Sequence, residues 1–386
     1  MSKKNKTGKI ILSKGLMTAL KIVFIVFIIL SLIFIAARTI GGVTLKSLVS
    51  DIKTSVSNLG TGEGYPYRLS GTDIEKTFSD SSNIFVFCEN KTMLLSPSAK
   101  KISDIPVEYG TPGINFNNGK AVVFDRDSGQ YRIQSSSEII YEQDLKDKII
   151  STAAISRNGT CAVAYIDENS HNIFEVFNKS EKSIFKWDLS SERVTSVDIS
   201  DDNKYAVVST VYSKNAEMNS KVYVFRFDSK DYVSCFDFYG DAVVNVSYNK
   251  HHDIAVISDN GRSYIEDNTS LQEQFDFSSD VLYKATDNKS SVSAVALRKY
   301  GGDTFGTVKV FNGKDFLYSI DTEKELRGVS VYNNKICILT AGEALIYNKK
   351  GEKTDDIKLD SVFDDVILKG RKVYLINSLE IERKKF

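Results

Sequence analysis

Residue types that build common active sites are scarce in this sequence. Its 386 residues include three histidines, four cysteines and one tryptophan. The histidines (His171, His251 and His252) form neither a His-x-His nor a His-x-x-x-His pair, whereas a metal site needs three or four converging ligands. Nucleophile elbows, phosphate loops and dinucleotide fingerprints are also missing. The sequence therefore predicts no catalytic residues, no metal site and no bound cofactor.

The four cysteines, Cys88, Cys161, Cys235 and Cys337, would permit disulfides in an oxidising compartment. Their local sequence favours another interpretation, because no Cys-x-x-Cys pair occurs. Each lies in an apolar or alternating run typical of a strand, such as Ile336-Cys337-Ile338-Leu339. Cysteine in such a run behaves as a small buried hydrophobe. We therefore expect four free thiols in a core.

Acidic residues are missing from positions 1–21, which contain six lysines. The next segment, Ile22–Ala37, carries no charge, and with Leu16–Leu20 it gives about 22 residues, near the length that a helix needs to cross a bilayer. Lys21 lies close enough to one end for its ammonium group to reach the lipid headgroups. We predict a transmembrane helix over 16–38 that follows a basic cytoplasmic tail over 1–15.

The charge asymmetry also predicts orientation and excludes a class of partner. Lysine-rich flanks stay in the cytoplasm, so everything after Arg38 is expected on the extracellular side. Residues 22–386 contain 44 basic and 50 acidic residues, a net charge of −6 with no basic stripe, which argues against nucleic acid as a partner. The rival interpretation is a secretory signal cleaved after Ala36-Ala37. The apolar run is long for a signal, and Phe34 and Ile35 crowd the cleavage site, so we favour a retained anchor.

A stalk or linker is predicted over 39–64. Gly41-Gly42 suits the end of the membrane helix. Apolar residues then recur at close to helical spacing, at Leu45, Leu48, Val49, Ile52, Val56 and Leu59. Thr61–Gly64 forms a flexible joint, so the folded domain is expected over 65–386.

From Tyr65 onward the sequence predicts an all-β domain, because runs of Val, Ile, Phe, Tyr and Thr alternate with turns of Asn, Asp, Gly, Ser and Lys. One unit recurs, in which a strand meets an Asn/Asp/Gly turn and then a more uniformly apolar strand. These apolar strands begin at Ile84, Ala121, Cys161, Tyr205, Ile254, Val292, Ile336 and Val373. A period near 40 residues is typical of four-stranded propeller blades. We predict an eight-bladed β-propeller, with seven blades as the alternative.

The two ends of the repeat region predict how the ring closes. After Val373–Ile376 the chain has room for one more strand, Leu379–Arg383, so the last blade lacks a fourth strand. Tyr65–Leu69 precedes the first unit and has no blade of its own. Pairing of these two segments would complete the blade and remove an exposed sheet edge. Pro66 suits such an outermost strand.

The basic tail, the apolar segment and a β domain opening on Tyr65-Pro66-Tyr67-Arg68-Leu69-Ser70-Gly71 together resemble an uncharacterised family. Its members are single-pass, propeller-like membrane proteins of Gram-positive bacteria, grouped as a domain of unknown function. The resemblance covers nearly the whole chain and implies a bacterial cell-surface location, but it supplies no active-site residue. In fold alone, the architecture also looks like quinoprotein-type and outer-membrane assembly propellers, and fold does not determine function.

Enzymes built on propellers would require residues that are sparse here. A sialidase would need several arginines facing the axis, but only Arg193 and Arg327 lie near inner strands, and a quinone cofactor would stack on tryptophan, but Trp187 lies in an outer strand. Asp125–Gly129 could wrap calcium, although a hairpin turn favours the same residues, and we interpret it as a turn. The remaining enzyme hypothesis is a cell-surface polysaccharide hydrolase or lyase with carboxylates facing the axis.

Two long connections indicate where a partner could bind. The segments Ser213–Ser220 and Lys299–Phe305 are expected to be loops between second and third strands, and therefore to emerge on one face of the ring. Their apolar residues, Met218, Tyr300 and Phe305, are the candidate interaction residues. The alternative is neutral drift in loop length. The sequence thus predicts a membrane-anchored extracytoplasmic binding or scaffolding module with a protein or cell-envelope partner.

Overall fold

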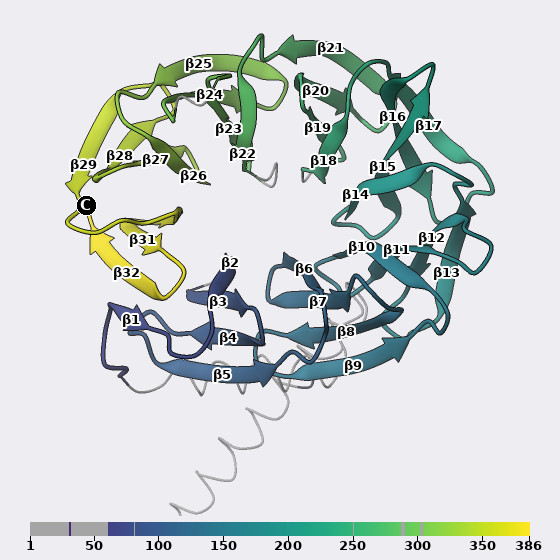
Figure 1. The fold of residues 1–386 in the computed structure, drawn as a ribbon, viewed down its shortest axis with the longest axis horizontal. Helices are drawn as coiled ribbons and strands as arrows, with labels where there is room; N and C mark the ends of the chain where they lie inside the picture. Colours follow the sequence, from purple (N-terminus) through teal and green to yellow (C-terminus); the bar gives the residue numbers. More distant parts are fainter. Residues whose placement is uncertain (1–30, 32–60, 81, 250, 287–289, 302–303) are drawn as a thin grey trace, which may run out of the picture. The chain divides into compact units, whose positions relative to one another are not determined.

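The computed structural model describes residues 31, 61–80, 82–249, 251–286, 290–301 and 304–386. The predicted tail, membrane helix and stalk lie outside these residues, apart from Ser31 and residues 61–64. Within the described part of the chain, no helix is long and apolar enough to cross a membrane. Residues 61–386 form eight four-stranded antiparallel sheets, which follow one another around a ring (Figure 1). The predicted eight-bladed β-propeller is confirmed.

Each blade runs from an inner strand at the axis to an outermost strand at the rim, and blades 1–4 are built from consecutive strands. Blade 1 contains β2 (Ile74–Asp80), β3 (Asn83–Cys88), β4 (Lys91–Leu95) and β5 (Lys101–Pro106). Blade 2 contains β6 (Pro112–Asn117), β7 (Lys120–Asp125), β8 (Gln130–Ser135) and β9 (Ile139–Asp144). Blade 3 contains β10 (Ile149–Ile155), β11 (Cys161–Ile166), β12 (Asn172–Phe177) and β13 (Ser183–Asp188). Blade 4 contains β14 (Arg193–Ile199), β15 (Tyr205–Lys214), β16 (Glu217–Arg226) and β17 (Tyr232–Phe238).

Blades 5–7 follow the same order, and blade 8 takes its outermost strand from the other end of the domain. Blade 5 contains β18 (Val243–Tyr248), β19 (Ile254–Ser258), β20 (Gly261–Glu266) and β21 (Ser270–Asp276). Blade 6 contains β22 (Val281–Ala285), β23 (Val292–Arg298), β24 (Gly306–Asn312) and β25 (Asp315–Asp321). Blade 7 contains β26 (Leu326–Tyr332), β27 (Lys335–Thr340), β28 (Glu343–Asn348) and β29 (Lys353–Lys358). Blade 8 contains β30 (Asp365–Lys369), β31 (Lys372–Ile376), β32 (Glu380–Lys385) and β1 (Tyr67–Arg68).

The predicted closure is confirmed. Tyr67 pairs with Ile381 and Arg68 with Glu380, so that purple β1 lies beside yellow β32 (Figure 1). The Leu69 amide donates to the Leu379 carbonyl at 2.7 Å. This pairing joins the two ends of the domain and gives blade 8 its fourth strand.

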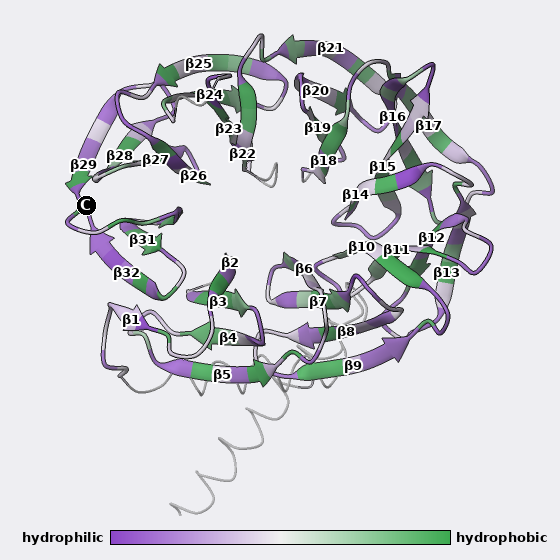
Figure 2. Ribbon diagram, viewed as in Figure 1, coloured by the Kyte–Doolittle hydropathy of each residue, from purple (hydrophilic) through white to green (hydrophobic). Residues whose placement is uncertain are grey.

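The second strands form the buried layer of each blade. Every residue of β3 and of β19 is buried, and β7 and β11 are buried along almost their whole length. Because both faces of these strands are covered by neighbouring blades, their sequences are continuously apolar. The outermost strands, such as β5 and β29, alternate between exposed and half-buried residues. Figure 2 shows the same contrast in hydropathy between β19 or β23 and β29.

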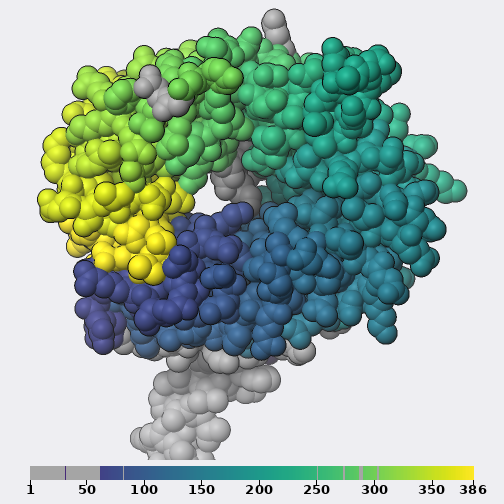
Figure 3. Space-filling view, viewed as in Figure 1, coloured from purple at the N-terminus to yellow at the C-terminus, as the bar shows by residue number. Residues whose placement is uncertain are grey.

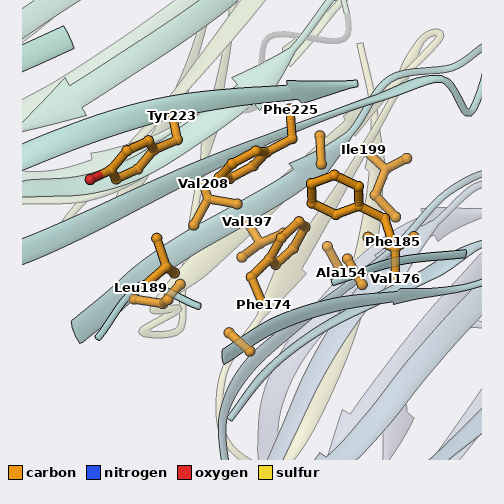
Figure 4. Packing of buried hydrophobic residues seen from close by; sticks show 14 residues of the cluster. Ala154, Phe174, Val176, Phe185, Leu189, Val197, Ile199, Val208, Tyr223 and Phe225 are labelled. Carbon is orange, nitrogen blue, oxygen red and sulfur yellow. The ribbon is translucent and has the colours of Figure 1, made fainter. Parts of the chain in front are cut away.

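Aromatic packing holds neighbouring blades together. Phe225 of blade 4 is fully buried and stacks on Phe174 of blade 3 with ring centroids 5.6 Å apart. Phe185 lies 5.3 Å from the same ring, and Trp187 lies 5.2 Å from it. Figure 4 shows this cluster between the two blades. As predicted, Trp187 lies in an outermost strand, β13, where it packs against this cluster.

The inner strands carry a feature that the sequence did not reveal. Six of the eight shift register by one residue against their second strand, for example between Val194 and Ser196 in β14. Such bulges increase the local twist of a strand. They recur beside the central opening, which is visible in Figure 3, where the inner strands of all blades converge.

Candidate docking surface

The two faces of the ring are defined by which turns they carry. Because successive strands in a blade are antiparallel, turns between second and third strands emerge on the same face as the connections between blades. We call this the upper face. The lower face carries the turns between first and second strands and between third and fourth strands. Met218, Tyr300 and Phe305 all belong to the upper face, as the sequence predicted.

The segment Ser213–Ser220 is not a loop, which corrects that part of the sequence prediction. β15 and β16 continue as a paired hairpin, with Ser213 opposite Met218 and Lys214 opposite Glu217. The turn consists of Asn215 and Ala216 alone, both with positive φ, at 55° and 65°. A two-residue turn of this kind matches the twist of a hairpin. Met218 is therefore held on a strand, with 54% of its surface exposed.

The second predicted segment, between β23 and β24, is a loop. The Lys299 amide donates to the Phe305 carbonyl at 3.3 Å, and the Lys299 ammonium pairs with Asp280 at 3.1 Å. Tyr300 is 82% exposed and Phe305 is 46% exposed. These side chains therefore do not fold back onto neighbouring blades to become buried.

The sequence prediction did not include three further apolar residues of this face. Tyr239 lies between β17 and β18, Val362 between β29 and β30, and Leu379 between β31 and β32. They are 71%, 64% and 49% exposed. Together with Tyr300 and Phe305, they are the large exposed apolar residues found in turns, and the described turns of the lower face contain none. The sequence feature that could have identified them is a large apolar residue in an otherwise polar turn.

The faces also differ in charge. Counting described residues between strands, the turns of the upper face carry fifteen Asp and Glu against five Lys and Arg. The corresponding turns of the lower face carry nine acidic and ten basic residues. The upper face is therefore both acidic and apolar, whereas the lower face is close to neutral.

A groove of about 400 Å³ opens between blades 4 and 5, lined in part by Tyr239, Leu271 and Asp241. The Gln274 side chain donates to the Asp241 carboxylate at 2.8 Å. Burial opposes ionisation of Asp241, but hydrogen bonds from Asp259, Ser258 and Gln274 outweigh it and lower its pKa. Burial and the bond to Asp241 raise the pKa of Asp259.

Near the central opening, several described carboxylates pair with basic side chains. Asp365 of β30 is ion-paired with Lys284 of β22. Arg327 of β26 pairs with Glu325 at 2.8 Å and with Asp364 at 3.1 Å. The carboxylate with a raised pKa, Asp259, lies in the turn between β19 and β20. No group of carboxylates with raised pKa values surrounds the opening within the described ranges.

The other candidate motifs serve local structure. Asp125 accepts hydrogen bonds from the amides of Thr111 and Asp127 and from the Ser128 hydroxyl, which confirms the turn interpretation of this segment. His171 lies in a turn and bonds Asp188 at 2.9 Å. Over the residues that the structure covers, no group of three or more His, Cys, Asp or Glu is placed to hold a metal ion. The four cysteines are free, three buried and Cys235 half-buried.

Comparison with known proteins identifies relatives by sequence family and by fold. Residues 67–386 match the model of a family described as "Family of unknown function (DUF5711)", and no curated protein matches the sequence. The C-terminal WD40 domain of Sif2 superposes with a TM-score of 0.58 at 12% identity, covering 84% of this chain and 99% of that domain. Sqt1 from Saccharomyces cerevisiae gives 0.57 at 12% identity, with 84% and 100% covered. BamB from Moraxella catarrhalis gives 0.52 at 11% identity, with 82% and 100% covered. These likenesses show the propeller fold.

Proposed function

The chain belongs to the DUF5711 family of unknown function, and we propose that it is a membrane-anchored binding or scaffolding module whose upper face docks a protein or cell-envelope partner. The anchor is the apolar segment over 16–38, and the propeller lies outside the cytoplasm. The proposal fits the basic tail before the apolar segment.

The observation that carries the proposal is the uneven distribution of exposed apolar turn residues. Tyr300, Tyr239 and Val362 are each more than 60% exposed on the upper face. Side chains this exposed contribute little to folding, and an excess of exposed apolar residues on one face is what a binding surface would provide. Aromatic residues are frequent energetic centres of protein interfaces. The upper face therefore carries exposed aromatic and apolar side chains that a docking partner could bury.

The route of the chain into the ring supports the same assignment. The Gly62 amide donates to the Ser98 side chain at 3.0 Å, and the Gly64 amide donates to the Ser98 carbonyl at 3.1 Å. Ser98 lies in the turn between β4 and β5, on the lower face. The first described residues of the domain therefore lie at the lower face, and the upper-face turns do not contact them.

Docking is tested by shortening the two upper-face projections in the full chain. Residues 213–218 are replaced by Asn-Gly between Tyr212 and Asn219, and residues 299–305 by a short turn. Both segments bury little apolar surface, so the free energy of unfolding should change by less than about 1 kcal/mol. Partner recovery from detergent-solubilised membranes should fall, while a matched shortening of the lower-face turn over 178–182 should leave it unchanged. Unchanged recovery from the folded upper-face variant would refute this docking site.

Topology is tested separately with intact, wall-stripped cells. Added protease should cut turns of the propeller or release the domain without membrane rupture. Full protection until the membrane is broken would show that the orientation is wrong.

A further inference from the structure

Acidity and exposed apolar surface coincide on the upper face, and together they restrict the chemistry of its partner. This inference rests on the proposed function and extends it. An acidic surface repels nucleic acid and anionic lipid, and it attracts cationic groups over a Debye length of about 10 Å. The exposed aromatic side chains would in addition be buried by apolar groups on the same partner.

Part of the acidity is already neutralised within the ring. Glu192 pairs with Lys221 at 2.6 Å, Asp280 with Lys299 at 3.1 Å, and Glu325 with Arg327 at 2.8 Å. Other exposed carboxylates of this face form no ion pair among the described residues: Glu108, Asp147, Glu168, Glu217, Asp237 and Glu323. These carboxylates are therefore available to pair with a cationic partner.

Blade 4 shows how this surface already holds an ammonium group. Lys221 donates to Glu192, and its Nζ lies 5.2 Å from the ring centroid of Tyr212. A carboxylate and a tyrosine ring therefore hold one cation together. Tyr239 follows Asp237 closely in the chain, and both are exposed, so they offer the same two groups to solvent.

We propose that the upper face binds a polypeptide segment rich in lysine or arginine and interspersed with apolar residues. Its cationic groups pair with Glu217, Asp237 and Glu323. Its apolar side chains contact Met218 of the β15–β16 hairpin and Tyr239, which lines the groove between blades 4 and 5. The combination of carboxylates and exposed apolar side chains favours a polypeptide over a small polyamine, because a polyamine has no apolar side chains to cover Met218.

The test uses the full chain in a nonionic detergent and three probes: a fluorescent lysine–leucine peptide, its glutamate–leucine counterpart, and spermine as competitor. A charge variant carries Glu217→Gln, Asp237→Asn and Glu323→Gln. An apolar variant carries Met218→Ser, Tyr239→Ser and Tyr300→Ser. The matched control carries Asp201→Asn, Asp231→Asn and Asp267→Asn on the lower face, with the same change in net charge. Circular dichroism and melting confirm that each variant is folded.

The lysine peptide should bind, and the glutamate peptide should not. In the charge variant its Kd should rise roughly tenfold at low salt and much less at high salt, because rim charges act through screened attraction. The apolar variant should weaken binding at every salt concentration, whereas the control should stay within about twofold of the wild type. Spermine should compete weakly.

Three results would overturn the inference. Equal weakening in the charge variant and the control would mean non-specific attraction to net charge. Full competition by spermine would indicate that the face binds a small polycation and not a polypeptide. No binding of the lysine peptide, or binding unaffected by both upper-face variants, would exclude this partner chemistry. None of these results depends on partner recovery after shortening of the projections, so failure of the inference is distinguishable from failure of the proposed docking face.

Discussion

Removal of the apolar contacts of the closing segment should destabilise the whole ring. Tyr65, Tyr67 and Leu69 pack against the cluster that contains Tyr374, Ile376 and Ile381, and the Tyr65 and Tyr374 rings lie 5.4 Å apart. If each of the three side chains buries about 100 Å² of apolar surface, their transfer contributes about 7.5 kcal/mol at about 25 cal/mol/Å². A compact unfolded state lowers this figure to about 5 kcal/mol. The triple serine variant should lose that amount, a large part of the stability of a typical domain.

Hydrogen exchange separates ring opening from local fraying. If closure locks the ring, amides of blades 3–6 should lose protection in the triple variant, although they lie far from the altered residues along the chain. The ion pair between Arg68 and Glu380 stays intact and contributes little at the surface. The control carries serine at the exposed positions Met218, Tyr239 and Tyr300 and should unfold at the wild-type denaturant midpoint. Loss of protection confined to blades 1 and 8 would refute a cooperative ring.

Three further outcomes follow from the packing and the titrating groups. Phe225→Ala should lower the free energy of unfolding by about 3–5 kcal/mol in denaturant titration, because its ring contacts three other aromatic rings across the blade 3–4 interface. Burial raises the pKa of Cys88 and Cys337 to about 12, so thiol reagents at neutral pH should label them only after unfolding, and prior reduction should not change the labelled mass. Burial lowers the pKa of Lys369 to about 8, below its value of about 10.4 in the unfolded chain. The unfolded state therefore binds more protons between these values, and stability should rise with pH from about 8 to about 10; Lys369→Met should remove that rise from the difference between variant and wild type.

The blade pattern was predictable because it follows from burial alone. Second strands such as β3 are covered on both faces, so an uninterrupted apolar run predicts them. Their start positions agree with the sequence prediction to within one residue. Closure was predictable for a similar reason: an incomplete last blade and an unassigned first strand must satisfy each other's backbone groups.

The hairpin at Met218 was misread because its local composition is that of a loop. Ser213, Lys214, Asn215 and Glu217 are polar, and nothing in their order distinguishes an exposed paired strand from an irregular connection. The register is set by the buried parts of β15 and β16, and the same pairing continues outward to Lys214 and Glu217. Long-range register is not visible in local sequence.

The bulges of the inner strands and the asymmetry of the faces escaped prediction for a geometric reason. A bulge such as that after Val194 depends on how strongly a strand must twist at the axis, and both register choices leave similar sequence patterns. The acidic, apolar character of the upper face emerges only when turns about 40 residues apart are assigned to the same side. Tyr239 lies between blades 4 and 5 and Tyr300 in blade 6, and only the topology of the ring shows that both are on the upper face.

This architecture separates the residues that stabilise the ring from those available for recognition. Stability comes from clusters between blades, such as the one around Phe225, and from the closing contacts of Tyr65. Neither set reaches the exposed ends of the upper-face turns, where Tyr300 is 82% exposed. Substitutions there change the surface presented to a partner at little cost in folding free energy. A partner-binding face can therefore vary in charge and apolar anchors while the eight blades and their closure remain intact.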